Sequence, residues 1–143
     1  HGAARRERGG AAVALLGVAD PMMAHDYMTE DAAVTATLLD RLTYDRTLYS
    51  ILLSHRPELF EVYREKGIDL ALTGHAHGGQ IVLPFLGGLV APNQGLFPKY
   101  WGGLYQAGGT AMVVSRGIGN SILPFRINNR PELVIVTLHS RPA

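Results

Sequence analysis

Short apolar runs occur along this chain before and after a stretch whose apolar residues recur at helical spacing. Val34, Leu38 and Leu42 recur every fourth residue, which predicts a helix that begins near Thr29 and packs one face onto a sheet. The apolar runs are bounded by Gly, Pro or polar residues, as is typical of buried strands, and cover residues 11–18, 48–54, 68–73 and 110–115. This alternation of strand and helix predicts an α/β fold.

The stretch 48–73 has the pattern of a βαβ unit. Pro57 occupies the position favoured at the start of a helix, and Gly67 ends that helix before the second strand begins. A crossover of this kind joins parallel strands and is right-handed. The carboxyl ends of both strands therefore lie at the same edge of the predicted sheet.

Three histidines follow these two strands. His55 comes directly after the first strand, and His75 and His77 come after the second, in the sequence D-L-A-L-T-G-H-A-H-G-G-Q at 69–80. In an extended backbone His75 and His77 would point the same way, and ligands bind at this edge of open α/β sheets. The pattern predicts metal ligation by His55, His75 and His77. The alternative is a glycine-flanked turn whose histidines bond only to backbone.

The rest of the chain predicts fewer regular elements. Residues 85–109 are rich in Gly, Pro and aromatic residues and are expected to form an ordered excursion with short hairpins. Residues 125–128 and 132–139, with a turn between them, predict a terminal antiparallel hairpin. No linker divides the chain, so 1–143 is expected to be a single domain.

Composition narrows the function classes. The hydrophobic share of 47% is typical of a folded domain. A net charge of +1 does not indicate a surface that binds nucleic acid. The chain has no cysteine, so a metal here must use histidine, carboxylate or amide ligands. No apolar stretch approaches the roughly 18 residues of a membrane span. Composition leaves a cytoplasmic or a membrane-peripheral location open.

Four motifs in order carry a family resemblance: L-L-S-H-R-P-E-L-F at 52–60, D-L-A-L-T-G-H-A-H-G-G-Q-I at 69–81, K-Y-W-G-G-L-Y at 99–105, and S-R-G-I-G-N-S…P-F-R…N-R-P-E-L at 115–133. Together they resemble the C-terminal half of a calcineurin-like metallophosphoesterase. The most similar branch is a bacterial, membrane-peripheral one that includes YkuE-like and YaeI-like enzymes and a UDP-2,3-diacylglucosamine pyrophosphatase. The resemblance runs from about Ala11 to His139.

The resemblance implies a sandwich of two β-sheets flanked by helices, and two divalent metals of the Mn²⁺, Zn²⁺ or Fe²⁺ type. It implies that His55 and His75 ligate one metal and His77 the other, and that a hydroxide attacks phosphorus. The substrate would be a phosphorylated small molecule or a lipid-linked phosphodiester or pyrophosphate. Arg116 and Arg126 are candidates for holding its phosphate, and the alternative for these arginines is a salt bridge to Glu132 or to helix carboxylates.

The chain also departs from the family pattern. The family's D-x-H, G-D-x-x-D and G-N-H-D/E motifs are absent. Imidazoles alone would have to hold two dications close together, without a carboxylate to offset their repulsion. We therefore expect a C-terminal fragment of a longer protein that is inactive alone, holds one metal at most, and needs the N-terminal half as its partner.

Other interpretations remain open from the sequence. Unpaired strand edges would favour oligomers, and the apolar excursion could touch a membrane. A different class of function is a non-catalytic binding or assembly module derived from this fold. A third hypothesis, a hydrolase with one metal held by three histidines, would need this chain only.

Overall fold

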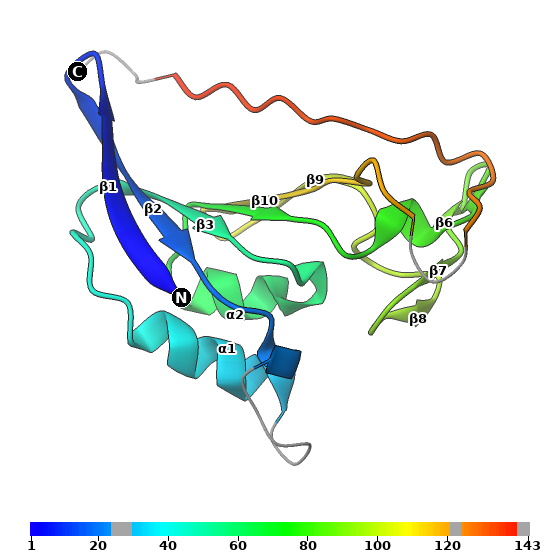
Figure 1. The fold of residues 1–143 in the computed structure, drawn as a ribbon, viewed down its shortest axis with the longest axis horizontal. Helices are drawn as coiled ribbons and strands as arrows, with labels where there is room; N and C mark the ends of the chain where they lie inside the picture. The colour runs from blue at the N-terminus through cyan, green and yellow to red at the C-terminus, as the bar shows by residue number, and fades with distance from the viewer. Residues whose placement is uncertain (24–29, 121–123, 140–143) are drawn as a thin grey trace.

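A six-stranded sheet forms the centre of the chain, seen here in a computed structural model that describes residues 1–23, 30–120 and 124–139 (Figure 1). The strand order is β1-β2-β3-β4-β10-β9. Its strands are β1 (Gly2–Arg8), β2 (Ala11–Gly17), β3 (Tyr49–Leu53), β4 (Leu70–Thr73), β9 (Gly103–Ala107) and β10 (Thr110–Val114). The four inner strands run parallel to one another, and β1 and β9 pair antiparallel at the two edges.

The predicted βαβ unit is present. Strand β3 leads through a 3-10 turn, η2 (Pro57–Leu59), into helix α2 (Phe60–Glu65), and the chain returns as β4. Strands β3 and β4 are parallel, with Ile51 opposite Leu70. Helix α1 (Asp31–Asp40) confirms the other predicted helix, although Thr29, its expected cap, lies outside the described residues.

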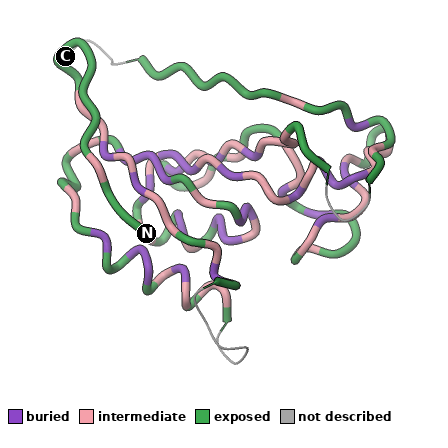
Figure 2. The backbone as a smooth tube through the Cα atoms, in the orientation of Figure 1, coloured by how far each residue is buried: buried purple, intermediate pink, exposed green. Residues whose placement is uncertain are grey.

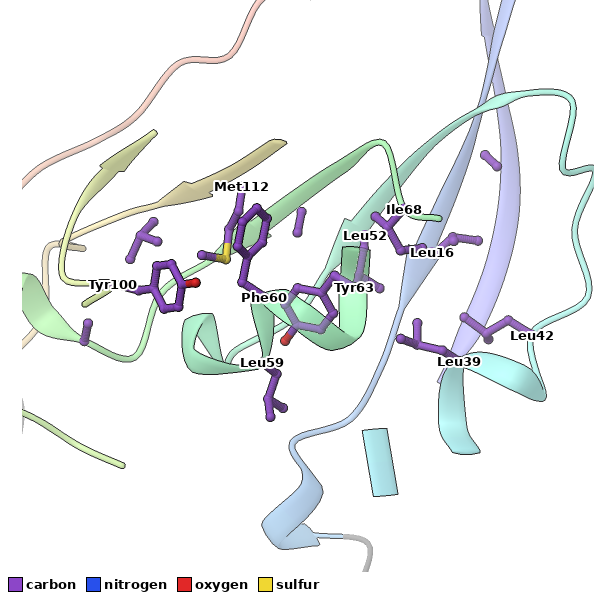
Figure 3. Close-up of a cluster of buried hydrophobic side chains, with 14 of the residues drawn as sticks. Leu16, Leu39, Leu42, Leu52, Leu59, Phe60, Tyr63, Ile68, Tyr100 and Met112 are labelled. Carbon is purple, nitrogen blue, oxygen red and sulfur yellow. The ribbon is translucent and has the colours of Figure 1, made fainter. Parts of the chain in front are cut away.

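Both helices cover the same face of the sheet, and the core lies between them and the strands (Figures 1 and 3). Alternation along the strands supplies that face: Leu52, Ala71 and Met112, from three neighbouring strands, are all 0% exposed. Tyr63 of α2 is also 0% exposed, and the helix thus anchors the crossover against the sheet. This packing fixes the carboxyl ends of β3 and β4.

The predicted C-terminal hairpin is wrong. Residues 131–139 form no strand; they run extended across the face of the sheet opposite the helices, with mostly exposed side chains (Figures 1 and 2). Leu133 is 83% and Ile135 84% exposed. Residues 125–128 cannot serve as the partner because Ile127 instead forms a parallel bridge with Ile81. The alternating apolar pattern favours an extended backbone, but no described strand pairs with it.

The excursion contains the short hairpins expected there. They are β5 (Val82–Leu83) with β6 (Gly87–Gly88), and β7 (Val90–Ala91) with β8 (Gly95–Leu96). Two further 3-10 turns are η1 (Pro21–Met23) and η3 (His77–Gly79). Among the described residues, no helix has the length and apolar character that crossing a membrane requires.

Candidate metal centre

The edge of the sheet brings His55 and His75 together. Strands β3 and β4 are parallel and nearly in register at their ends, and the Gly74 N–H donates to the His55 carbonyl over 3.4 Å. As a result, His75 Nδ1 lies 2.9 Å from His55 Nε2. The two ring centroids are 4.5 Å apart and the planes are inclined by 59°. The sequence therefore placed this pair correctly at one edge.

The spacing of this pair fits a shared metal ion. Two nitrogen ligands at about 2.0–2.1 Å from one ion and at right angles to each other lie about 3 Å apart. The observed 2.9 Å between His55 Nε2 and His75 Nδ1 is close to that spacing. His75 is half-buried and His55 is exposed, and the facing nitrogens of the two imidazoles already lie within this spacing at the end of β3 and β4.

His77 is held apart from this pair in the 3-10 turn η3. Its Nδ1 is buried and has no hydrogen-bond partner among the described residues. No group of three or more His, Asp or Glu side chains suited to a metal occurs within residues 1–23, 30–120 and 124–139. The predicted convergence of all three histidines on one point is thus met for His55 and His75 only, and the ligand role of each stays a prediction.

Burial favours the neutral forms of His55 and His77. Desolvation lowers the pKa of His55, the positive charge of a protonated His75 lowers it further, and Asp20 and Glu58 partly oppose this. Desolvation also lowers the pKa of His77, assisted by the nearby Arg126 cation. A neutral imidazole is the form that binds a metal, so both shifts favour ligation near pH 7.

Arg56, the residue after His55, anchors the end of β3. Its side chain is 0% exposed and pairs with three carboxylates: Asp31 at the start of α1, Glu58 at 2.8 Å and Asp20 at 3.8 Å. The Arg56 carbonyl in turn accepts a 2.6 Å hydrogen bond from the Tyr63 hydroxyl. This buried network ties His55 to both helices, and sequence reasoning did not identify it.

A second residue missed from the sequence is Asn93. Its Oδ1 lies 2.8 Å from His75 Nε2, the nitrogen that points away from His55. A carbonyl-type oxygen there accepts a hydrogen bond from the Nε2–H of His75. The Nδ1 of His75 is then unprotonated, with its lone pair directed at His55 Nε2. Asn93 follows a proline at the tip of the β7–β8 hairpin with φ of 60°, and no sequence signal distinguishes it from an ordinary turn asparagine.

The two arginine candidates differ in their contacts. Arg116 is paired with Glu132, to which its Nε donates over 2.8 Å, as the salt-bridge alternative predicted. Arg126 instead donates from one nitrogen to the carbonyls of Arg116 and Gly119, while its Nε and Nη1 are buried without a described partner. Of the two, Arg126 is therefore the one with donors left for a ligand.

Comparison with known proteins places these observations in a family context. The chain is 44% identical over 102 residues to the uncharacterized metallophosphoesterase YkuE of Bacillus subtilis, across 71% of this chain. It is 36% identical over 94 residues, or 66% of this chain, to the phosphodiesterase YaeI of Escherichia coli. An uncharacterized metallophosphoesterase of Aquifex aeolicus is 37% identical over 99 residues, or 68% of this chain.

These similarities support a metallophosphoesterase family. The mixed α/β sheet agrees with part of a metallophosphoesterase domain. The matched region covers 34%, 34% and 35% of the three relatives, so the chain spans about a third of the length of the metallophosphoesterases it matches. No protein-family model matches the sequence, and no solved structure matches it.

Proposed function

We propose that this chain is the C-terminal part of a metal-dependent phosphoester hydrolase, acting on a phosphodiester or pyrophosphate. The observation that supports it best is the His55–His75 pair, 2.9 Å apart at the ends of two parallel strands. The relatives named metallophosphoesterase share this part of the sequence. Within the family, the motifs favour the branch that contains YkuE-like and YaeI-like proteins.

In this proposal His55 and His75 hold one divalent ion of the Mn²⁺, Zn²⁺ or Fe²⁺ type, and His77 contributes to a second. When bound, such ions supply Lewis acidity and a nucleophilic hydroxide. The chain's own residues supply the imidazoles: Asn93 orients His75, and Arg56 anchors the backbone next to His55 through its buried pair with Asp31. No described carboxylate joins the pair, so the acidic ligands would come from an N-terminal half of the domain.

Arg126 is proposed to hold the substrate phosphate, with Arg116 in a supporting role. Arg126 lies close enough to His77 for its charge to lower the pKa of that histidine. Its two unpartnered nitrogens, Nε and Nη1, suit a phosphate, which accepts paired hydrogen bonds from a guanidinium. The substrate class that fits is a phosphorylated small molecule or a lipid-linked phosphate.

Hydrolysis of bis(4-nitrophenyl) phosphate by the intact protein with added Mn²⁺ tests the proposal. His75→Ala should lower the rate by more than about 100-fold, since loss of outer-shell partners alone typically costs 10–100-fold. His139→Ala is the matched control, because that histidine is exposed and far along the chain from the site. Activity that survives His75→Ala unchanged would overturn the proposal.

A second candidate function is a non-catalytic binding or assembly module with the same fold. It is favoured by one observation: the described residues hold no carboxylate together with the histidine pair. An intact protein whose remaining sequence also lacks acidic metal-ligand motifs, and which shows no hydrolysis with Mn²⁺, would support this alternative.

A further inference from the structure

Asn129 contacts the histidine turn from a distant part of the chain. Its side chain is 3% exposed, and its Nδ2 donates to the His77 carbonyl over 2.7 Å and to the Gln80 carbonyl over 3.2 Å. These contacts join residues 52 and 49 positions apart in the sequence. Both amide hydrogens are thus used on the two ends of one turn.

The turn that Asn129 contacts has an unusual backbone. His77 has φ of 46° and Gln80 has φ of 55°, both in the left-handed region that residues other than glycine rarely adopt. Such conformations persist only when their surroundings hold them. The surroundings here include Asn129, whose Cγ would lie 2.8 Å from a Cβ added at Gly78. The amide therefore occupies the space that the missing side chain of Gly78 leaves.

Backbone pairing brings Asn129 to this position. The Ile127 N–H donates to the Gln80 carbonyl over 3.3 Å, and the Val82 N–H donates to the Ile127 carbonyl over 2.9 Å. Asn129 Oδ1 is buried and has no described partner, so the side chain is held through its two donors. The reverse orientation of the amide would place its oxygen against two carbonyls and is disfavoured.

We propose that Asn129 is a positioning residue that clamps the His77–Gln80 turn and thereby fixes the His77 imidazole at the edge of the site. The consequence of the clamp is specific to His77. His55 and His75 follow the ends of β3 and β4, and their side chains contact each other and Asn93 instead. The effect of this clamp on metal binding by His77 rests on the proposed function.

Amide hydrogen exchange in the full chain tests the clamp itself. Asn129→Asp keeps the shape of the side chain but removes both donors, so exchange of the Gln80 and Val82 amides should speed up at least about tenfold. The amides of Leu52 and Ala71 in β3 and β4 should keep their rates. Asn129→Ser, which retains one donor, should give an intermediate acceleration and serves if the aspartate variant does not fold.

Exchange broadening of the imidazole resonances by Zn²⁺, which is diamagnetic and therefore acts on the side chains that bind it, tests the link to His77. In the unchanged chain, Zn²⁺ should broaden the resonances of His55, His75 and His77. In Asn129→Asp, only His77 should need at least about tenfold more Zn²⁺ for the same broadening. Asn128→Asp is the matched control, because Asn128 is exposed and should behave like the unchanged chain.

The outcomes separate the clamp from the proposed function. Unchanged exchange at Gln80 and Val82 in Asn129→Asp overturns the clamp, as does equal weakening of the broadening at all three histidines. No broadening at any histidine in the unchanged chain counts against the proposed function. The exchange rates then still decide whether Asn129 holds the turn.

Discussion

Arg116 and Arg126 are ten residues apart and look equivalent in the sequence, yet their surroundings give them different chemistry. Burial by itself would raise the pKa of Glu132, but hydrogen bonds from Arg116 lower it below its usual value. Arg116 is thereby committed to Glu132. Arg126 is bonded to carbonyls only, and its remaining donors are free of any described carboxylate.

This difference predicts the effect of Arg116→Gln. Loss of the charged donors should raise the pKa of Glu132, measured by NMR titration of its carboxyl carbon. Because the folded-state pKa is lowered in the unchanged chain, the pair stabilises the fold above about pH 4.3. That contribution is lost as pH falls through the lowered pKa, so the two proteins should converge in unfolding free energy at a pH below that pKa. A constant difference down to that pH would contradict the assignment.

Gly79 predicts a steric limit within the histidine turn. Its φ is 71°, and a Cβ there would lie 2.9 Å from the Gly88 carbonyl carbon. Gly67 has nearly the same φ, 69°, but open space around it. Gly79→Ala should therefore lower the unfolding free energy by at least about 1 kcal/mol more than Gly67→Ala does. Urea denaturation measures both losses. Equal losses would show that conformation alone, and not the contact with Gly88, restricts this position.

At the scale of elements, Arg56 joins the end of β3 to the start of α1 and to η2. It is fully buried beside Asp20, Asp31 and Glu58, so its removal would leave carboxylates without their cation. Arg56→Met should cost about 3–5 kcal/mol of unfolding free energy. Arg64→Met, which breaks a surface pair with Glu61, should cost less than about 1 kcal/mol. Chemical denaturation measures both, and similar losses would contradict the role given to Arg56.

The elements that could be predicted are those whose signals are local. Apolar runs, Pro57 and Gly67 suffice for the βαβ unit, and that unit places His55 beside His75. Strand β1 was missed because its residues Arg5, Arg6 and Arg8 are polar; as an edge strand it needs pairing on one side only. The contacts of Asn93, Asn129 and Arg56 depend on side-chain positions between distant segments, which no spacing in the sequence reveals.

At the scale of the whole molecule, one face of the sheet lacks a covering layer among the described residues. The helices pack on the other face, and residues 131–139 cross the uncovered one (Figure 1). Tyr49 and Leu53 of β3 are 43% and 45% exposed there, whereas Ile51 between them on the same face is 9% exposed. An apolar face of this kind is expected to meet further β structure, as a sandwich would provide.

This face predicts self-association of the 143-residue chain. Sedimentation should show concentration-dependent oligomers, because the exposed apolar side chains of residues 133–138 pair with no described strand. Ile135→Lys should weaken the association at least about tenfold. Met23→Lys is the control, since Met23 is equally exposed, at 84%, but lies away from this segment. A chain that stays monomeric, or two variants that behave alike, would count against this role for the segment.

The bridge between Ile81 and Ile127 has a consequence for how the surface over the histidines can change. It fixes the base of the β5–β6 hairpin beside the histidine turn, and strands β9 and β10 of the central sheet lie between the two bridged residues in the sequence. The β5–β6 hairpin projects from that base with Phe85 at its exposed tip, and the β7–β8 hairpin follows it with exposed Leu96 in β8. Length and composition can vary at the β5–β6 tip while the base holds the turn at 77–80, whereas the β7–β8 hairpin must keep Asn93 for its bond to His75. Grafting the β5–β6 tip between relatives is thus a direct way to alter ligand choice while leaving the histidines in place.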